Sequence, residues 1–390
     1  MTEQGSFLEH ISIQGYRRLL SLNLEMRPLA VIVGANGVGK TSLLEVFSLL
    51  AASAKGQLES KISEYGGLNE ILTRDKAQKI EFSLHTRLPN HDPLEYILQV
   101  KPQGPFYEIG LETLTQNEVS SRRSSYYSPH ISSHGADVQY YDSERETGGP
   151  LRPNWQYNRY ETSLSQVPKM FAEPENLRQK LASCTFYGAL NVLPNSPVRL
   201  PQPMRPVTLP GVNGEDLVVC LYYLRETDPD RFEVIEDTLK SAFPDFEKLS
   251  FPPVAAGTLA MTWKDRNFSQ PFYMNQLSEG TLRFLWLTTL LLSRDLTAIT
   301  LIDEPEVSLH PQLLSLLADL LRDASQRTQL IVATHADRLV RALQPNEILV
   351  ADQENGVTTM KWGDALDLER WLADYTMDEL WGMNIFGGRS

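Results

Sequence analysis

Residues 34–41 read Gly-Ala-Asn-Gly-Val-Gly-Lys-Thr and satisfy the pattern G-x-x-x-x-G-K-[ST]. In such a loop the glycines let backbone N–H groups surround phosphates, a lysine neutralises the β- and γ-phosphate oxygens, and a hydroxyl group binds Mg²⁺. We therefore predict an ATP site in which Lys40 is catalytic and Thr41 is a magnesium ligand. The residues assigned to the nucleotide are Gly34, Asn36, Gly37, Gly39, Lys40, Thr41 and Ser42. The alternative is a tight turn with an incidental lysine.

Two adjacent carboxylates, Asp303 and Glu304, end the apolar stretch 299–302 and precede Pro305. Asp303 would hold magnesium through its water shell, and Glu304 would orient and deprotonate the water that attacks the γ-phosphate. Paired acids at the end of a strand also occur without a function. Together with the glycine loop, however, they favour ATP hydrolysis with Glu304 as the catalytic base.

Two more short motifs are informative only in combination with the glycine loop and the two carboxylates. Leu277-Ser278-Glu279-Gly280 precedes an apolar helical stretch, and Thr334-His335 ends an apolar strand. In this order the four motifs resemble the ABC-type ATPase heads of the RecF, SMC and Rad50 group. They are most similar to the stand-alone AAA_21-like, or OLD-type, predicted ATPases. The resemblance covers residues 1–100 and 245–390.

The resemblance implies roles for residues outside the glycine loop. Ser278 and Gly280, in the signature motif at a helix N-terminus, would bind a γ-phosphate held by a second copy of the chain. His335 would sense the γ-phosphate and aid the attacking water as a third catalytic residue, and Arg17 would approach the phosphates. Because one copy cannot complete its own site, the resemblance implies a homodimer that encloses two ATP molecules.

The sequence also departs from related patterns. Glu279 and Thr281 stand where transporter-type heads have glycine and glutamine, which argues against a membrane transporter head. His310 stands where SMC-type heads have aspartate, so the role of that loop at the dimer interface is in doubt.

The elements around the motifs predict an α/β fold. An apolar strand at 29–33 leads into the glycine loop, and residues 40–55 have the periodicity of a helix. Strands and helices alternate again from residue 249, which predicts a mostly parallel sheet with an added antiparallel part. We predict a head divided into 1–115 and 248–390, with an insertion at 116–247 and no coiled-coil arms.

The insertion is predicted to begin with a mobile loop at 116–166, rich in Ser, Tyr, Arg and Gly, and to continue as a small helical subdomain. The loop is interpreted as a solvated surface segment, or as a partner or nucleic-acid contact built on Arg122 and Arg123. Near the C-terminus the spacing of four residues fits a helix packed on the core, or a partner surface. These residues are Trp371, Leu372, Leu380 and Trp381.

Composition narrows the class of protein. The 390 residues carry a formal net charge of -13, so DNA would need a local basic patch. The chain has two cysteines, Cys184 and Cys220, too few for a disulfide framework. No apolar run is long enough to span a bilayer and no leader precedes the first strand, so we expect a cytoplasmic protein without membrane contact.

Two functions remain open. In the first, the protein is an ATPase whose ATP-dependent dimer controls DNA or an effector protein in anti-phage defence or genome maintenance. In the second, it is a nearly inactive, ATP-gated scaffold that sequesters a partner protein. The filled catalytic positions favour the first. A metabolic P-loop kinase is disfavoured because it has no use for Leu277–Gly280.

Overall fold

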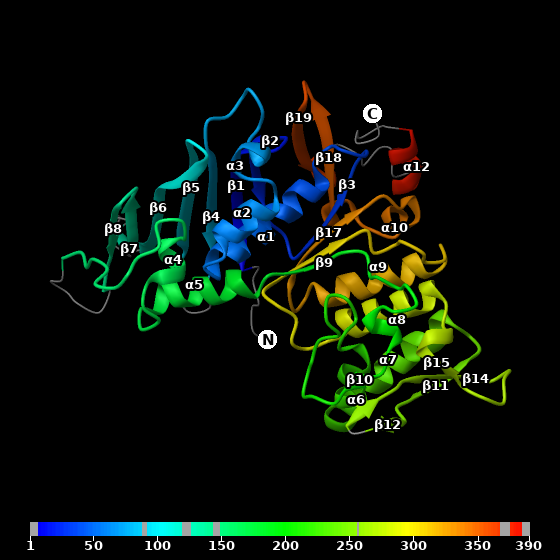
Figure 1. The fold of residues 1–390 in the computed structure, drawn as a ribbon. Coiled ribbons are helices and arrows are strands. Elements are labelled where there is room, and N and C mark those ends of the chain that lie inside the picture. The colour runs from blue at the N-terminus through cyan, green and yellow to red at the C-terminus, as the bar shows by residue number, and fades with distance from the viewer. Residues whose placement is uncertain are drawn as a thin grey trace.

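The computed structural model describes residues 7–87, 92–118, 126–142, 149–255, 257–366 and 375–383, and two large sheets dominate it (Figure 1). The first sheet has seven antiparallel strands in the order β2-β1-β4-β5-β6-β7-β8. Its strands are β1 Leu8–Tyr16, β2 Leu19–Glu25, β4 Ile80–Thr86, β5 Leu94–Gln103, β6 Phe106–Glu118, β7 Tyr126–His134 and β8 Asp137–Tyr140. They alternate buried and more exposed residues, as in β4 and β5, because one face packs on the core.

The second sheet has six strands in the order β19-β18-β3-β17-β16-β9. Its strands are β3 Leu29–Val33, β9 Thr185–Tyr187, β16 Ile299–Asp303, β17 Gln329–Thr334, β18 Ile348–Glu354 and β19 Val357–Trp362. All neighbouring pairs are parallel except β18 with β19. The carboxyl ends of β3, β16 and β17 therefore meet at one edge, where open α/β sheets bind their ligands.

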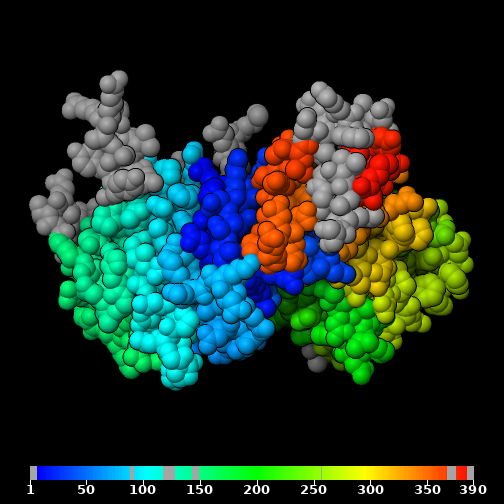
Figure 2. All heavy atoms as spheres, turned by 90° about the horizontal axis from the view of Figure 1, so that it is seen from above, coloured from blue at the N-terminus to red at the C-terminus, as the bar shows by residue number. Residues whose placement is uncertain are grey.

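The parallel sheet separates two hydrophobic cores. Ala30 and Ile32 of β3 belong to the core formed with α1, α5 and the antiparallel sheet. Val31 and Val33 face the other core, formed with α6 to α9. Since both faces are covered, β3 is a continuous apolar run with no exposed position. Figure 2 shows the N-terminal strands beside the C-terminal hairpin of β18 and β19.

Helices and short strands complete the two halves. The helices are α1 Lys40–Ala54, α2 Leu58–Glu64, α3 Leu68–Ile71, α4 Ser163–Gln166, α5 Ala172–Ser183, α6 Leu217–Thr227, α7 Pro229–Ala242, α8 Glu279–Leu291, α9 Leu313–Ala324, α10 Asp337–Arg341 and α12 Met377–Gly382. Two small sheets contain β10 Gln202–Pro203, β12 Pro253–Ala255 and β13 Thr258–Leu259, and β11 Phe246–Ser250, β14 Thr262–Asp265 and β15 Phe272–Tyr273. Single-turn 3-10 helices are η1 Pro197–Arg199, η2 Met274–Gln276, η3 Pro345–Glu347 and η4 Gly363–Ala365.

The predicted α/β fold with parallel and antiparallel parts is confirmed. Among the described residues the longest helix is α1, with 15 residues, so no long coiled-coil arm occurs there. None of the described helices has the length and apolar character needed to cross a membrane. Leu380 and Trp381 are buried in the second core, as expected for a packed helix, while Trp371 and Leu372 lie outside the described residues.

The prediction of a mobile loop at 116–166 is wrong where β6, β7 and β8 occupy the segment, whereas most of 149–162 lies outside helices and strands. β6 crosses the predicted boundary at residue 115, and β7 and β8 extend the antiparallel sheet. Their buried side chains combine apolar residues such as Leu114 and Ile131 with Ser133, which hydrogen-bonds Ser163. The predicted helical subdomain likewise contributes a strand, β9, to the parallel sheet. Arg122 and Arg123 lie outside the described residues.

Candidate nucleotide-binding site

The glycine loop connects β3 to α1 and is held from behind by the C-terminal hairpin. Gly39 has φ 105°, a left-handed conformation that favours glycine. A Cβ atom on Gly39 would lie 2.6 Å from Oγ1 of Thr358 in β19. The same hydroxyl donates a hydrogen bond of 2.6 Å to the Val38 carbonyl. The loop conformation therefore depends on residues at the opposite end of the chain.

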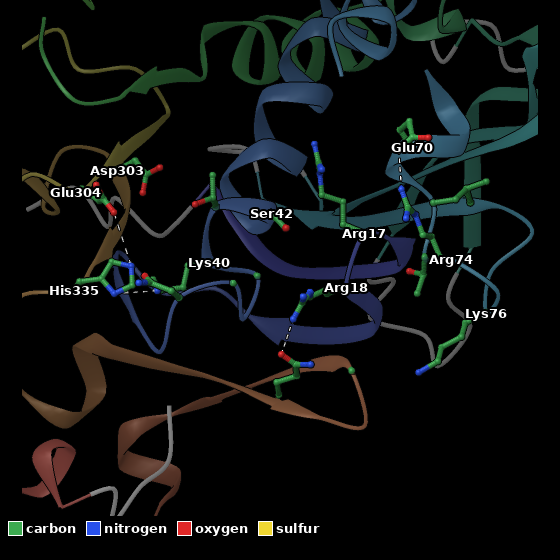
Figure 3. A pocket seen from close by; sticks show the side chains of 18 residues that line it. Arg17, Arg18, Lys40, Ser42, Glu70, Arg74, Lys76, Asp303, Glu304 and His335 are labelled. Carbon is green, nitrogen blue, oxygen red and sulfur yellow. Dashed lines mark hydrogen bonds and ion pairs between the residues drawn. The ribbon is translucent and has the colours of Figure 1, made fainter. Parts of the chain in front are cut away.

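A cavity of about 700 Å³ opens beside this loop, a size within the range of small-molecule sites (Figure 3). Most of the predicted residues line it: Arg17, Asn36, Gly37, Gly39, Lys40, Thr41, Ser42, Asp303, Glu304 and His335. Gly34 does not line the cavity, but its carbonyl contacts Lys40. The structure thus brings together residues that lie about 300 positions apart in the sequence.

Lys40 lies at the end of the cavity that also contains Asp303, Glu304 and His335. Its side chain is buried, and Nζ donates hydrogen bonds to the carbonyls of Gly34 (2.7 Å) and Ala35 (2.9 Å). His335 Nδ1 lies 3.4 Å from the same atom. Burial lowers the pKa of Lys40 to about 8, although the charges of Asp303 and its neighbours oppose this shift. A phosphate group bound here would stabilise the ammonium form of Lys40, because a nearby anion favours the charged form of a lysine.

The acidic residues and His335 lie on the carboxyl edge of β16 and β17. Burial, reinforced by the charge of Glu304, raises the pKa of Asp303 to about 6. Glu304 adopts φ 50° and its Oε1 lies 3.9 Å from His335 Nε2. Burial and the positive charge of Lys40 lower the pKa of His335, so its neutral form is favoured. The backbone N–H of His335 donates to Glu306 at 2.7 Å, which fixes the start of the following loop.

The residues at this end fit a phosphate chain with magnesium. At this end Asp303, Glu304 and Glu306 act electrostatically on Lys40, and this local excess of negative charge suits a divalent cation. The described residues contain no cluster of three His, Cys, Asp or Glu that could hold a metal by itself. Thr41 and Asp303 would accordingly be two protein ligands, and phosphate and water oxygens would supply the others. The N–H groups of the first turn of α1 lack intrahelical acceptors and are available to phosphates.

The opposite end of the cavity is basic, and sequence reasoning found only one of its residues. Arg17 contacts Glu45, with Nε 2.6 Å from the carboxylate, and lies in a left-handed turn with φ 47°. Arg18, Arg74 and Lys76 also line this end (Figure 3). Other lining residues that were not predicted are Glu70, Leu72, Thr73, Gln353 and Gly356. No local pattern marks them, because they meet through long-range pairing such as Arg18 Nη1 to Gln353 Oε1 at 2.6 Å.

Ser278 and Gly280 do not line this cavity. Ser278 caps α8 by accepting a hydrogen bond of 3.1 Å from the Thr281 N–H. A Cβ atom on Gly280 would lie 2.5 Å from the Ser308 carbonyl oxygen, so the signature turn packs directly on the loop that follows Asp303 and Glu304. His310 lies on the same loop and accepts from the Gln312 N–H at 3.4 Å. The signature is thus ordered, but it belongs to a different surface.

Comparison with known families matches residues 29–341 to a family described as "AAA domain, putative AbiEii toxin, Type IV TA system". The chain belongs to this family. The matched range of this chain includes the glycine loop, Leu277–Gly280, Asp303, Glu304 and His335. Comparison with curated proteins gave no match.

Two solved structures share the fold. An SMC head bound to the C-terminal winged-helix domain of ScpA has a TM-score of 0.55 at 13% identity, covering 91% of this chain and 97% of that one. The Smc head with an extended coiled coil from Pyrococcus furiosus, bound to the C-terminal domain of ScpA, has a TM-score of 0.53 at 12% identity. It covers 94% of this chain and 100% of that one. The chain therefore has the fold of an ABC-type, SMC-like ATPase head, which confirms the resemblance.

Proposed function

We propose that this protein binds ATP with magnesium and hydrolyses it. One observation carries the proposal: Lys40, Thr41, Asp303, Glu304 and His335, from three separate motifs, line a single cavity. Lys40 would neutralise the β- and γ-phosphates, and Thr41 and Asp303 would hold magnesium. When bound, the cation offsets the charge that develops on the phosphates.

The remaining two groups would act on water. Glu304 would accept a proton from the attacking water, and neutral His335, 3.9 Å away, would orient that water beside the γ-phosphate. Because the environment lowers the pKa of His335, it is able to accept a hydrogen bond at neutral pH. Arg17, paired with Glu45, would support the phosphates from the basic end.

The active form in this proposal is a homodimer that encloses two ATP molecules. Ser278 and Gly280 are ordered at the start of α8, yet they do not line the cavity of their own chain. A second copy related by two-fold symmetry would place its signature over the γ-phosphate and complete the site. The fold shared with SMC heads supports this arrangement.

Two variants test the proposal by light scattering. Glu304→Gln should still bind ATP, because Glu304 is not assigned to nucleotide binding. It should remain trapped as a dimer, because glutamine cannot accept the proton of the attacking water. Lys40→Ala should lose both ATP binding and the dimer. If Glu304→Gln has the same mass with and without ATP, the dimer that encloses two ATP molecules is refuted. If both variants still hydrolyse ATP, the assigned site is refuted.

We further propose that the dimer controls DNA or an effector protein in anti-phage defence or genome maintenance, in the cytoplasm. The toxin-related description of the family supports an effector, and the matched SMC heads are bound to domains of a protein partner. The alternative is an ATP-gated scaffold that sequesters its partner. A turnover below about one per hour with every partner tested, as slow as an unassisted GTPase, would favour the scaffold.

A pull-down with Glu304→Gln identifies what the dimer holds. The variant is incubated in native lysate with ATP and magnesium, with and without nuclease, and Lys40→Ala is the control. DNA that is lost after nuclease treatment supports a DNA clamp, and Arg122 and Arg123 are then the first residues to replace. A nuclease-resistant protein that is absent with Lys40→Ala supports an effector.

A further inference from the structure

Arg199 connects a distant loop to the backbone directly before the signature. It ends the 3-10 helix η1 in the segment between β9 and β10. Its Nη1 donates to the carbonyls of Leu277 (2.9 Å), Asn275 (3.2 Å) and Met274 (3.4 Å). Its Nε donates to its own loop, at the Val192 carbonyl, at 2.6 Å. One guanidinium thus joins two segments that are about 75 residues apart.

The loop that carries Arg199 is itself firmly anchored. Val192 and Val198 are buried in the second core. Gln202 donates to the Gly214 carbonyl at 2.7 Å and accepts from the Val218 N–H at 2.8 Å, which ties the end of the loop to α6. A buried anchor on either side of Arg199 limits the positions of its guanidinium. A planar guanidinium held in this way can fix several carbonyls at once.

The segment that Arg199 holds determines where Ser278 lies. Leu277 directly follows η2, and Ser278 is the N-cap of α8. The Leu277 carbonyl belongs to the peptide bond that joins these two turns, so the 2.9 Å hydrogen bond from Arg199 acts on the direction in which α8 begins. Arg199 makes no contact with the nucleotide cavity, which lies elsewhere in its own chain.

We propose that Arg199 is a positioning residue that sets the signature motif for binding the γ-phosphate held by a second copy. The inference rests on the proposed ATP-dependent dimer. The loop follows β9, which pairs with the strand that carries Asp303, and its Arg199 bonds to the carbonyl directly before the signature. Arg199 therefore links the edge of the parallel sheet to the part of the chain that faces the partner.

The test compares Arg199→Ala with Arg205→Ala, both in the Glu304→Gln background. Arg205 lies in the same loop region, is more exposed and pairs with Asp216. Arg199→Ala should keep the ATP affinity of the monomer within about twofold and weaken the dimer at least about tenfold, the equivalent of about 1.4 kcal/mol. Arg205→Ala should change neither. Equal dimer affinity for the two variants, or loss of ATP affinity in Arg199→Ala, would overturn the inference.

Two further measurements separate this inference from the proposed function. Adding Arg199→Ala to Ser278→Ala should weaken the dimer no further, because Arg199 acts through the signature; full additivity of the two effects would refute this. If Glu304→Gln forms no dimer with ATP, the proposed ATP-dependent dimer is refuted independently of Arg199. Hydrogen exchange in the monomer still tests the positioning role, since amides 277–281 should exchange about tenfold faster in Arg199→Ala than in Arg205→Ala. Equal exchange would refute it.

Discussion

Replacing Thr358 with valine is expected to weaken ATP binding, although Thr358 does not line the nucleotide cavity. Its buried hydroxyl donates a hydrogen bond of 2.6 Å to the Val38 carbonyl inside the glycine loop. Valine keeps the side-chain shape but leaves that carbonyl without its donor. A buried acceptor without a partner costs about 1–3 kcal/mol. If the whole cost acts on the loop conformation that binds phosphate, ATP affinity falls by roughly 5- to 150-fold.

The measurement is ATP affinity by calorimetric titration, combined with the free energy of unfolding in urea. Thr359→Val is the matched control, because Thr359 is the next residue of β19 and its side chain points to the opposite face of the strand. Thr358→Ser keeps the hydroxyl and should retain most of the affinity. The reasoning is refuted if Thr358→Val and Thr359→Val bind ATP equally well, or if serine is as weak as valine.

Three other outcomes are expected. Gly280→Ala should abolish the ATP-dependent dimer while the monomer keeps its ATP affinity, because the new Cβ would lie 2.5 Å from the Ser308 carbonyl oxygen; light scattering and titration separate the two effects. Because the pKa of Lys40 is about 8, about half of this side chain is neutral at pH 8, and a bound phosphate favours its charged form. ATP binding at pH 8 should therefore be coupled to proton uptake by Lys40. At pH 6.5 Lys40 is already charged and should take up very few protons. Calorimetry in buffers of different ionisation enthalpy measures this uptake, and Lys40→Ala should lack it. Glu112→Ala should lower the free energy of unfolding by about 3 kcal/mol, because the buried carboxylate accepts hydrogen bonds from the Leu164 N–H (2.8 Å) and the Tyr96 hydroxyl (3.0 Å); a loss below about 1 kcal/mol in urea unfolding would contradict this.

Most strands of the parallel sheet were predictable because they are nearly continuous apolar runs, whereas β9, with a single buried residue, was missed. β3 is buried along its whole length, and β17 is too, so hydrophobicity alone identifies both. β7 was missed because Ile131 is its only buried aliphatic residue and its sequence is dominated by Tyr, Ser and His. Beside Ile131, its buried side chains make polar contacts, such as His130 with Gln116 at 3.3 Å. Such partners lie on other strands and leave no periodic signal.

The same distinction applies to the site. Lys40, Asp303 and His335 were found because each follows an apolar strand and belongs to a short motif. Arg18 and Gln353 were missed because their contact depends on the position of the C-terminal hairpin beside β3 and the turn between β1 and β2. The end of the cavity proposed to hold the phosphates could therefore be predicted from the sequence. The basic end could be found only from the three-dimensional structure.

The two halves of the proposed composite site belong to different cores, and this division has a mechanical consequence. α1, which opens at Lys40, packs in the core shared with the antiparallel sheet, whereas α8, which opens at the signature, packs in the core on the other face of the parallel sheet. In the proposed dimer each ATP would touch the first core of one copy and the second core of the other. A partner that moves one core relative to the other would then change both ATP sites together, as two-fold symmetry requires. The loop that carries Arg199 is anchored in the second core by Val192 and Val198, and Arg199 bonds to the Leu277 carbonyl, so in the proposed dimer such a movement would reach Ser278 through this loop.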